Sequence, residues 1–120
     1  MSIKTVVAGA SPKAARFSFK AVRELRLHKH PVVALGFRNG MIEDVKIQKG
    51  MPHIDEVHTI SLYMGIERQK EYYDYLIGLK PKRIIFNPGT NNPELLALAK
   101  KNKIEVIEDC MLVMLQMGEF

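Results

Sequence analysis

The sequence predicts a three-layer, Rossmann-like α/β domain with a mainly parallel sheet of about five strands. One observation and one rule of topology lead to this fold class. Short apolar runs rich in β-branched residues alternate with segments whose apolar residues recur at helical spacing. Strands joined through helices pair in parallel, with right-handed crossovers. A chain of 120 residues suits one domain, so we expect residues 1–120 to form a single unit.

Each expected strand is a short apolar run bounded by Gly, Pro, Asn or charged residues, which is typical of buried strands. We expect strands over residues 4–8, 32–35, 56–63, 83–86 and 104–107, with a short edge strand at 45–47. The pair Asn39 and Gly40 predicts a turn before that edge strand.

The expected helices carry apolar residues three and four positions apart, which places them on one face. They cover residues 18–27, 68–79, 93–101 and 111–117. Pro81 ends the second of these helices. The third begins at Asn92 and Pro93, because Asn is a favoured N-cap and Pro suits the first helical position.

Positive charge is concentrated in the first third of the chain. Up to Ile42, eight Lys or Arg residues face one acid, Glu24, whereas ten basic residues face twelve acids from Glu43 onward. A solvated basic helix face explains part of this pattern. The remaining excess favours an anionic ligand near the N-terminal strand.

The first strand leads into a turn that is typical of a phosphate site. Gly9, Ala10 and Ser11 have little side-chain bulk, so backbone N–H groups are open to a phosphate, and the following helix offers its positive N-terminal end. Ser11 stands where a dinucleotide fingerprint would have a second glycine. Because ligands bind at the C-terminal ends of parallel strands, we also expect the small and polar residues that follow the other strands to contribute.

The sequence argues against several other classes. No apolar stretch approaches the roughly 18 residues of a membrane span, and the first strand leaves no room for a signal peptide, so we expect a cytoplasmic protein. The four histidines lack close ligand spacing, and we expect no metal site. For Cys110, the neighbouring acids Glu108 and Asp109 favour an inert thiol over a reactive one that could form a mixed disulfide.

Two segments resemble a known family. Residues 6–22, VVAGASPKAARFSFKAV, and residues 83–115, which contain the Asn-Pro-Gly turn and Cys110, are similar to the small bacterial coenzyme A-binding proteins. Those proteins resemble the N-terminal coenzyme A-binding domain of the succinyl-CoA synthetase α subunit. After the second strand, many relatives have a V-x-P-V-N-P motif, whereas this chain has residues 33–38, VALGFR.

The resemblance implies that the chain binds coenzyme A or an acyl-CoA. With the turn chemistry above, it gives these candidate cofactor-binding residues: Gly9, Ala10, Ser11, Lys13, Arg16, Ser18, Gly36, Phe37, Arg38, Ser61, Tyr63, Asn87, Pro88 and Gly89. Arg16 would contact phosphate through its guanidinium, and Arg38 would meet the ribose or the 3′-phosphate.

No catalytic grouping is visible, so we expect a binding module without catalysis of its own. Two alternatives stay open: a small enzyme that uses NAD or another nucleotide, and a basic protein that interacts with nucleic acid. The absence of Asp and Glu between Glu24 and Glu43 argues against NAD, whose ribose usually meets a carboxylate at about that spacing. The basic residues form no nucleic-acid-binding signature. No membrane partner is expected, and the sequence leaves homo-oligomerisation open.

Overall fold

The computed structural model describes residues 2–120, within which seven strands form one sheet in the order β3-β4-β2-β1-β5-β6-β7. The strands are β1 Thr5–Ala10, β2 Val32–Gly36, β3 Met41–Ile42, β4 Val45–Gln48, β5 Thr59–Leu62, β6 Arg83–Phe86 and β7 Glu105–Glu108. The helices are α1 Phe17–Leu27, α2 Ile66–Gln69, the 3-10 turn Lys70–Tyr72, α3 Tyr73–Gly78, α4 Pro93–Lys101 and α5 Met111–Gln116.

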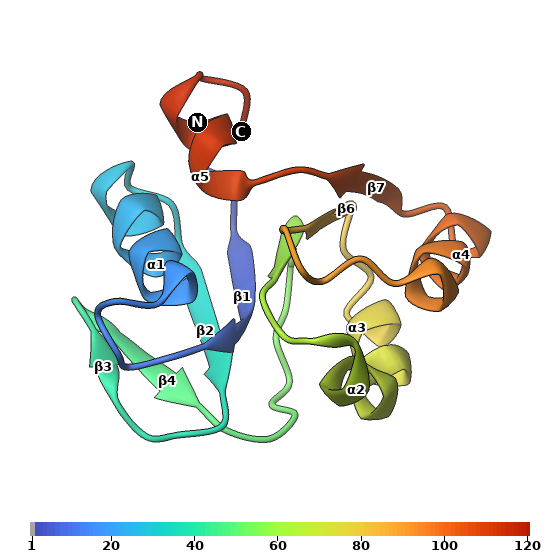
Figure 1. Ribbon diagram of the computed structural model, residues 1–120, viewed down its shortest axis with the longest axis horizontal. Helices are drawn as coiled ribbons and strands as arrows, with labels where there is room; N and C mark the ends of the chain where they lie inside the picture. The colour runs from blue at the N-terminus through green and yellow to red at the C-terminus, as the bar shows by residue number, and fades with distance from the viewer. Residues whose placement is uncertain (1) are drawn as a thin grey trace.

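The sheet lies between two layers of helices, with α1 and α5 on one face and α2, α3 and α4 on the other (Figure 1). Every strand pair is parallel except the β3/β4 hairpin. The predicted three-layer, Rossmann-like class is therefore confirmed. The chain runs from β1 outward to β2 and β4, and then returns to β5 on the other side of β1, so the strand order reverses between β1 and β5.

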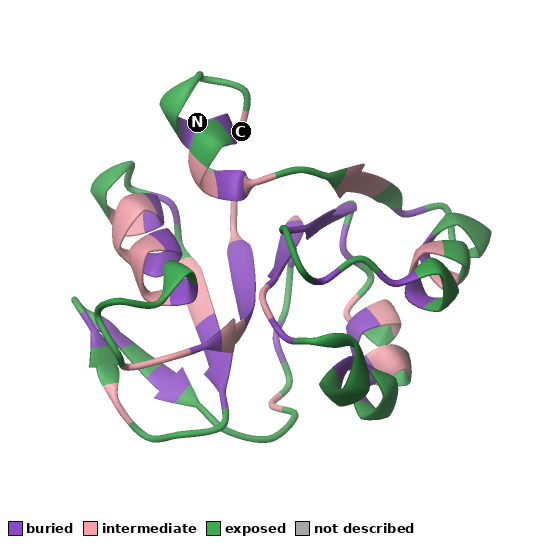
Figure 2. Cartoon of the chain, in the orientation of Figure 1, coloured by how far each residue is buried: buried purple, intermediate pink, exposed green. Residues whose placement is uncertain are grey.

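The core has two parts because both faces of the sheet are covered. Val7 in β1 and Leu25 in α1 belong to one apolar cluster, and Val6 and Leu95 belong to the other. The central strands β1, β5 and β6 are almost wholly buried, whereas the edge strands β3, β4 and β7 and the outer helix faces carry exposed residues (Figure 2). Successive side chains of β1 thus enter opposite layers, which fixes the register of the central strand.

The sheet has seven strands where about five were predicted, because one edge of the sheet is a hairpin. β3 is only two residues long and pairs with β4 through a turn at Glu43, which adopts a positive φ of 53°. We expected a turn at Asn39 and Gly40, which lie before β3 and not between β3 and β4. A two-residue strand has no periodicity of its own, so its pairing is visible only in the structure.

Two predicted strand boundaries are also corrected. β1 continues through Gly9 to Ala10, with a register shift between Ala8 and Ala10, so the first two residues of the expected turn belong to the strand. β5 begins at Thr59 and not at residue 56, because Glu56 adopts a positive φ of 55° that interrupts extended backbone.

The helix predicted over residues 68–79 is divided into α2, a 3-10 turn and α3. The two parts of this segment are each held by a buried side chain. Gln69 is fully buried and hydrogen-bonded at the carboxyl end of the sheet, whereas Leu76 is buried in the core beneath α3. The 3-10 turn Lys70–Tyr72 separates the helical turn that carries Gln69 from the one that carries Leu76.

The start of α4 is as predicted. Asn92 is its N-cap, and the Asn92 Oδ1 atom accepts hydrogen bonds from the backbone N–H groups of Glu94 and Leu95, at 3.1 and 3.3 Å. Pro93 occupies the first helical position.

Candidate functional site

A cleft of about 300 Å³ opens at the carboxyl ends of β1, β2 and β5, where the strand order reverses. This is the position at which open parallel sheets bind ligands. The residues that line it are Gly9, Ala10, Ser11, Pro12, Lys13, Arg16, Phe37, Arg38, Tyr63, Met64, Gly65 and Arg68.

The structure brings most of the predicted site residues to this cleft. Eight of them line it: Gly9, Ala10, Ser11, Lys13, Arg16, Phe37, Arg38 and Tyr63. The other six lie outside its lining: Ser18, Gly36, Ser61, Asn87, Pro88 and Gly89. Four lining residues were not predicted: Pro12, Met64, Gly65 and Arg68.

The two glycines at the ends of β1 and β2 allow the protein's own segments to pack closely. A Cβ on Gly9 would lie 2.7 Å from the Met64 amide nitrogen, and the positive φ of 101° at Gly9 also disfavours a side chain. A Cβ on Gly36 would lie 2.3 Å from the carbonyl oxygen of Ala10. Glycine at both positions therefore lets the backbone segments at the ends of these strands, which frame the cleft, pack closely against one another.

Ser18 stabilises the loop between β1 and α1. Its buried Oγ accepts a hydrogen bond from the Ser11 N–H at 3.1 Å, and the Ser11 Oγ accepts one from the Lys13 N–H at 3.1 Å. The N–H of Ser11, which we expected to be open to a phosphate, is therefore already engaged. The loop is fixed, and it presents the side chains of Lys13 and Arg16 at the cleft.

The cleft is strongly basic. Lys13, Arg16, Arg38 and Arg68 are exposed along its lining, which contains no Asp or Glu. Within residues 2–120, none of these four side chains forms an ion pair. The first turn of α1 carries no acid and no side-chain cap, so its N-terminal end adds positive potential beside Arg16. Together these groups favour a ligand with several negative charges.

The side chain of Arg68, in α2, contacts Phe37 in the loop that follows β2. Its guanidinium carbon lies 4.1 Å from the centre of the Phe37 ring, a cation–π contact. The Phe37 ring in turn meets Tyr72 edge-on, with ring centres 6.1 Å apart. No local pattern marks Arg68 as a site residue, because its position depends on the ring of Phe37, which lies in a different βα loop.

A buried polar network fixes the segment that carries Arg68. The Gln69 Nε2 donates to the carbonyl oxygens of Met64 and Thr90, at 2.9 and 3.0 Å. The Gln69 Oε1 accepts from the Asn92 Nδ2 at 2.9 Å, and the same nitrogen donates to the Tyr73 hydroxyl at 2.8 Å. Every hydrogen-bonding group of the buried Gln69 amide is used, so the first turn of α2 has a defined place.

The residues that follow β6 stabilise the sheet. The buried Asn87 donates to the Ser61 hydroxyl at 2.9 Å and to the Leu62 carbonyl at 3.0 Å, and its Oδ1 accepts from the Met111 N–H at 2.8 Å. Gly89 has a positive φ of 87°, and Thr90 closes the turn by donating to the Asn87 carbonyl at 2.7 Å. Pro88 and Gly89 are exposed next to this turn.

Tyr63 lines the cleft, and Cys110 lies near the Tyr63 hydroxyl. Burial raises the pKa of the Tyr63 hydroxyl well above its ordinary value, and the nearby Cys110 raises it further, so the phenol is neutral at physiological pH. Cys110 is half-buried at the N-cap of α5, with its N–H donating to Asp109 Oδ1 at 2.7 Å.

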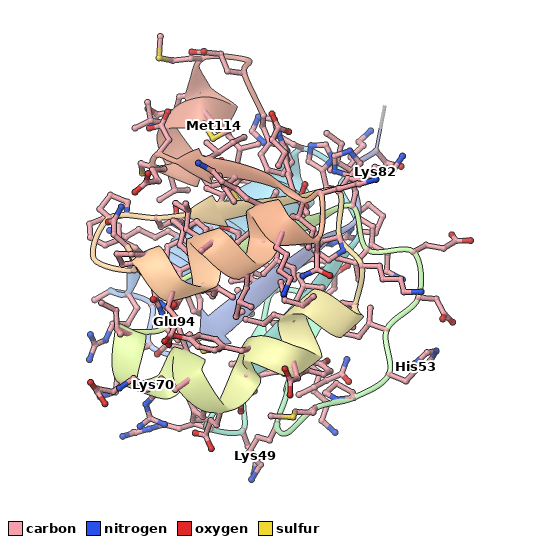
Figure 3. The ribbon with its side chains drawn as sticks, turned by 90° about the vertical axis from the view of Figure 1, so that its right-hand side faces the viewer. Lys49, His53, Lys70, Lys82, Glu94 and Met114 are labelled. Carbon is pink, nitrogen blue, oxygen red and sulfur yellow. The ribbon has the colours of Figure 1, made fainter. Side chains whose placement is uncertain are left out.

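A second, wider depression of about 850 Å³ lies at the opposite end of the sheet. Its lining includes His53, His58 and Lys82. Lys82 and His53 lie toward the edge of the molecule opposite Lys70 and Glu94 (Figure 3). Burial lowers the pKa of His58, and the charges of Arg83 and Lys82 lower it further, so this histidine is mainly neutral at physiological pH.

Residues 2–120 show neither a metal-binding cluster nor a membrane-spanning helix. His, Cys, Asp and Glu side chains do not gather there in groups of three that could hold a metal ion. None of the helices in this part of the chain is long and apolar enough to cross a membrane.

The fold and the cleft define a Rossmann-like domain with a basic cleft where the strand order reverses. The chain belongs to the CoA-binding domain family, whose model matches residues 4–116. This confirms the family resemblance seen in the sequence. No curated protein matches the chain.

Solved structures share the fold of this chain. A crystal structure of an uncharacterized protein is 38% identical to this chain, covers 100% of it and 99% of its own length, and has a TM-score of 0.97. A Thermus thermophilus protein is 17% identical, with a TM-score of 0.86 and coverage of 99% and 91%. A hypothetical protein from Pyrococcus horikoshii OT3 is 19% identical, with a TM-score of 0.83 and coverage of 97% and 83%. The last two show a shared fold.

Proposed function

We propose that this protein binds coenzyme A or an acyl-CoA in the basic cleft and acts as a binding module without catalysis of its own. The observation that carries the proposal is the set of four exposed cations, Lys13, Arg16, Arg38 and Arg68, along one cleft of a CoA-binding family member. Coenzyme A carries a pyrophosphate and a 3′-phosphate, which together hold about four negative charges.

The pyrophosphate fits the loop between β1 and α1. Arg16 stands at the N-cap of α1, where its guanidinium offers a bidentate contact and the helix end offers backbone N–H groups without a capping side chain. Lys13 adds a second charge from the same loop. The hydrogen bond between Ser11 and Ser18 keeps this loop in place before a ligand arrives.

The loop after β2 supports coenzyme A over NAD. Arg38 lines the cleft there, and the lining holds no carboxylate that could accept hydrogen bonds from the ribose hydroxyls of NAD. A guanidinium at this position suits a phosphorylated ribose.

The lining also supports a role in binding rather than catalysis. Its ionisable side chains are four cations and Tyr63. The raised pKa of Tyr63 makes it a poor general base near neutral pH. The positive groups suit recognition of charge, and their number matches the charge of the ligand.

Amide chemical-shift mapping tests the proposal on a chain of 13.7 kDa. Addition of coenzyme A should shift amide signals of the β1–α1 loop and of residues 36–38 and 63–68. Signals around His53 and Lys82, at the other end of the sheet, serve as the internal control. Shifts confined to that far end, or no shifts at millimolar ligand, would contradict the proposal. Stronger shifts with NAD or with oligonucleotide would favour the alternative functions.

A further inference from the structure

The contact between Phe37 and Arg68 joins the two halves of the cleft. Phe37 follows β2, on one side of the strand reversal, and Arg68 belongs to α2, which follows β5 on the other side. The distance of 4.1 Å from the guanidinium carbon to the ring centre places the cation over the ring. A guanidinium that stacks on an aromatic ring can still donate hydrogen bonds through its N–H groups.

Both partners of this contact are held by the protein. Phe37 packs against Tyr72, whose ring is buried in the core. Arg68 directly precedes Gln69, whose amide is fixed by Met64, Thr90 and Asn92. An otherwise flexible arginine therefore has a supported position at the cleft, which lowers the entropy lost when it binds an anion.

The four cations of the cleft fall into two groups by their place in the chain. Lys13 and Arg16 belong to the β1–α1 loop, and Arg38 directly follows Phe37. Arg68 reaches the Phe37 side through its contact with the ring. The cleft thus carries two cations from the β1–α1 loop and two beside the loop that follows β2.

We infer that Arg68, supported by the Phe37 ring, acts with Arg38 as the specificity determinant for the phosphate monoester on the ribose of the ligand. The inference rests on the proposed function. A monoester carries close to two negative charges at neutral pH, and a pair of guanidinium groups matches that charge. Phe37 is a positioning residue in this arrangement, because it acts through Arg68.

Calorimetric titration of the wild-type protein and of Arg68→Gln, with coenzyme A and with 3′-dephospho-coenzyme A at one salt concentration, tests the inference. The wild type should prefer coenzyme A. Arg68→Gln should lose about tenfold in affinity for coenzyme A and less than twofold for the dephosphorylated ligand, as expected for one charge-assisted contact. Phe37→Leu should reduce the same selectivity without removing a charge.

Lys70→Gln is the matched control. Lys70 is an exposed cation two residues from Arg68, lies outside the cleft lining and is 3.7 Å from Glu67. Its loss should leave the ratio of the two affinities unchanged. Thermal unfolding should show that each variant is folded, because Phe37, Arg68 and Lys70 are all exposed.

The outcomes separate the inference from the proposed function. If Arg68→Gln weakens both ligands by the same factor, or if the wild type does not distinguish them, the role of Arg68 at the monoester is overturned while coenzyme A binding stands. If the wild type binds neither ligand, the proposed function fails and the inference fails with it.

Discussion

The side chain of Asn87, at the end of β6, donates a 2.9 Å hydrogen bond to the Ser61 hydroxyl in the neighbouring strand β5. The same amide bonds the Leu62 carbonyl and the Met111 N–H. One buried residue thereby joins two strands and the start of α5 beside the strand reversal.

Asn87→Ala should therefore lower the free energy of unfolding by about 2 to 4 kcal/mol, because it leaves several buried polar groups unsatisfied. Urea unfolding measures the change. Asn91→Ala is the control, because Asn91 is exposed and its side chain donates to the exposed Glu108, so its effect should stay within about 0.5 kcal/mol. Equal losses in the two variants would contradict the role given to Asn87.

Gly9→Ala should destabilise the protein by about 2 kcal/mol or more, because the new Cβ meets the backbone of Tyr63 and Met64 at a positive φ. It should also weaken ligand binding, since relief of the clash displaces the β5–α2 loop. Gly65→Ala is the matched control, since a Cβ there meets no atom within 4 Å and φ is −69°. Thermal unfolding of both variants checks this. If Gly9→Ala leaves the unfolding temperature unchanged, the end of β1 does not pack against the backbone of Tyr63 and Met64 as described.

Arg16→Ala should weaken coenzyme A binding by about 1.5 to 3 kcal/mol, the usual range for a hydrogen bond to a charged group. Arg23→Ala is the control, because it also removes one positive charge from α1. The guanidinium carbon of Arg23 lies 5.9 Å from the centre of the Phe19 ring, and Arg23 lies outside the cleft lining. Its effect on affinity should be small and should vanish at high salt. If both variants bind coenzyme A equally well, Arg16 is not a phosphate anchor.

The stability of the fold should fall below about pH 6.5 because of His30. The Nδ1 of this buried ring accepts a hydrogen bond from the Ile3 N–H at 2.9 Å, which requires the unprotonated nitrogen. Burial lowers the pKa of His30, and the charges of His28 and Arg83 lower it further. The unfolded state therefore binds a proton at His30 more readily than the folded state does. The contribution of His30 to stability is complete above the pKa of the unfolded state and is lost as the pH falls through the pKa of the folded state.

His30→Asn isolates this contribution, because the Asn side-chain oxygen can accept the same hydrogen bond without titrating. Urea unfolding at pH 7.5 and pH 5 should show a smaller loss of stability in the variant than in the wild type. His58, whose pKa is also lowered, contributes equally to both proteins. The same pH dependence in both would exclude His30 as a source of the acid sensitivity.

The fold was predictable from sequence because its main elements have clear local signals. Asn92 and Pro93 mark the start of α4, and the apolar run at β6 marks a buried strand. β3 was missed because two residues carry no periodicity, and the break after Gln69 was missed because it depends on buried partners at Met64 and Thr90.

The site was predictable only in part, because small polar residues at strand ends serve two purposes. Ser11 and Asn87 looked alike as candidate ligand contacts, yet Ser11 lines the cleft whereas Asn87 is buried among strand ends. Arg68 could not be found from the sequence, since its place at the cleft depends on the ring of Phe37. Local patterns locate a βα turn, and tertiary packing decides which side chains face the ligand.

Calorimetric titration of ligand-free protein with coenzyme A and with NAD, at one fixed salt concentration, tests the central claim most directly. Our account predicts saturable binding of one coenzyme A per chain, with clearly weaker binding of NAD. Preference for NAD, or the absence of coenzyme A binding, would contradict it.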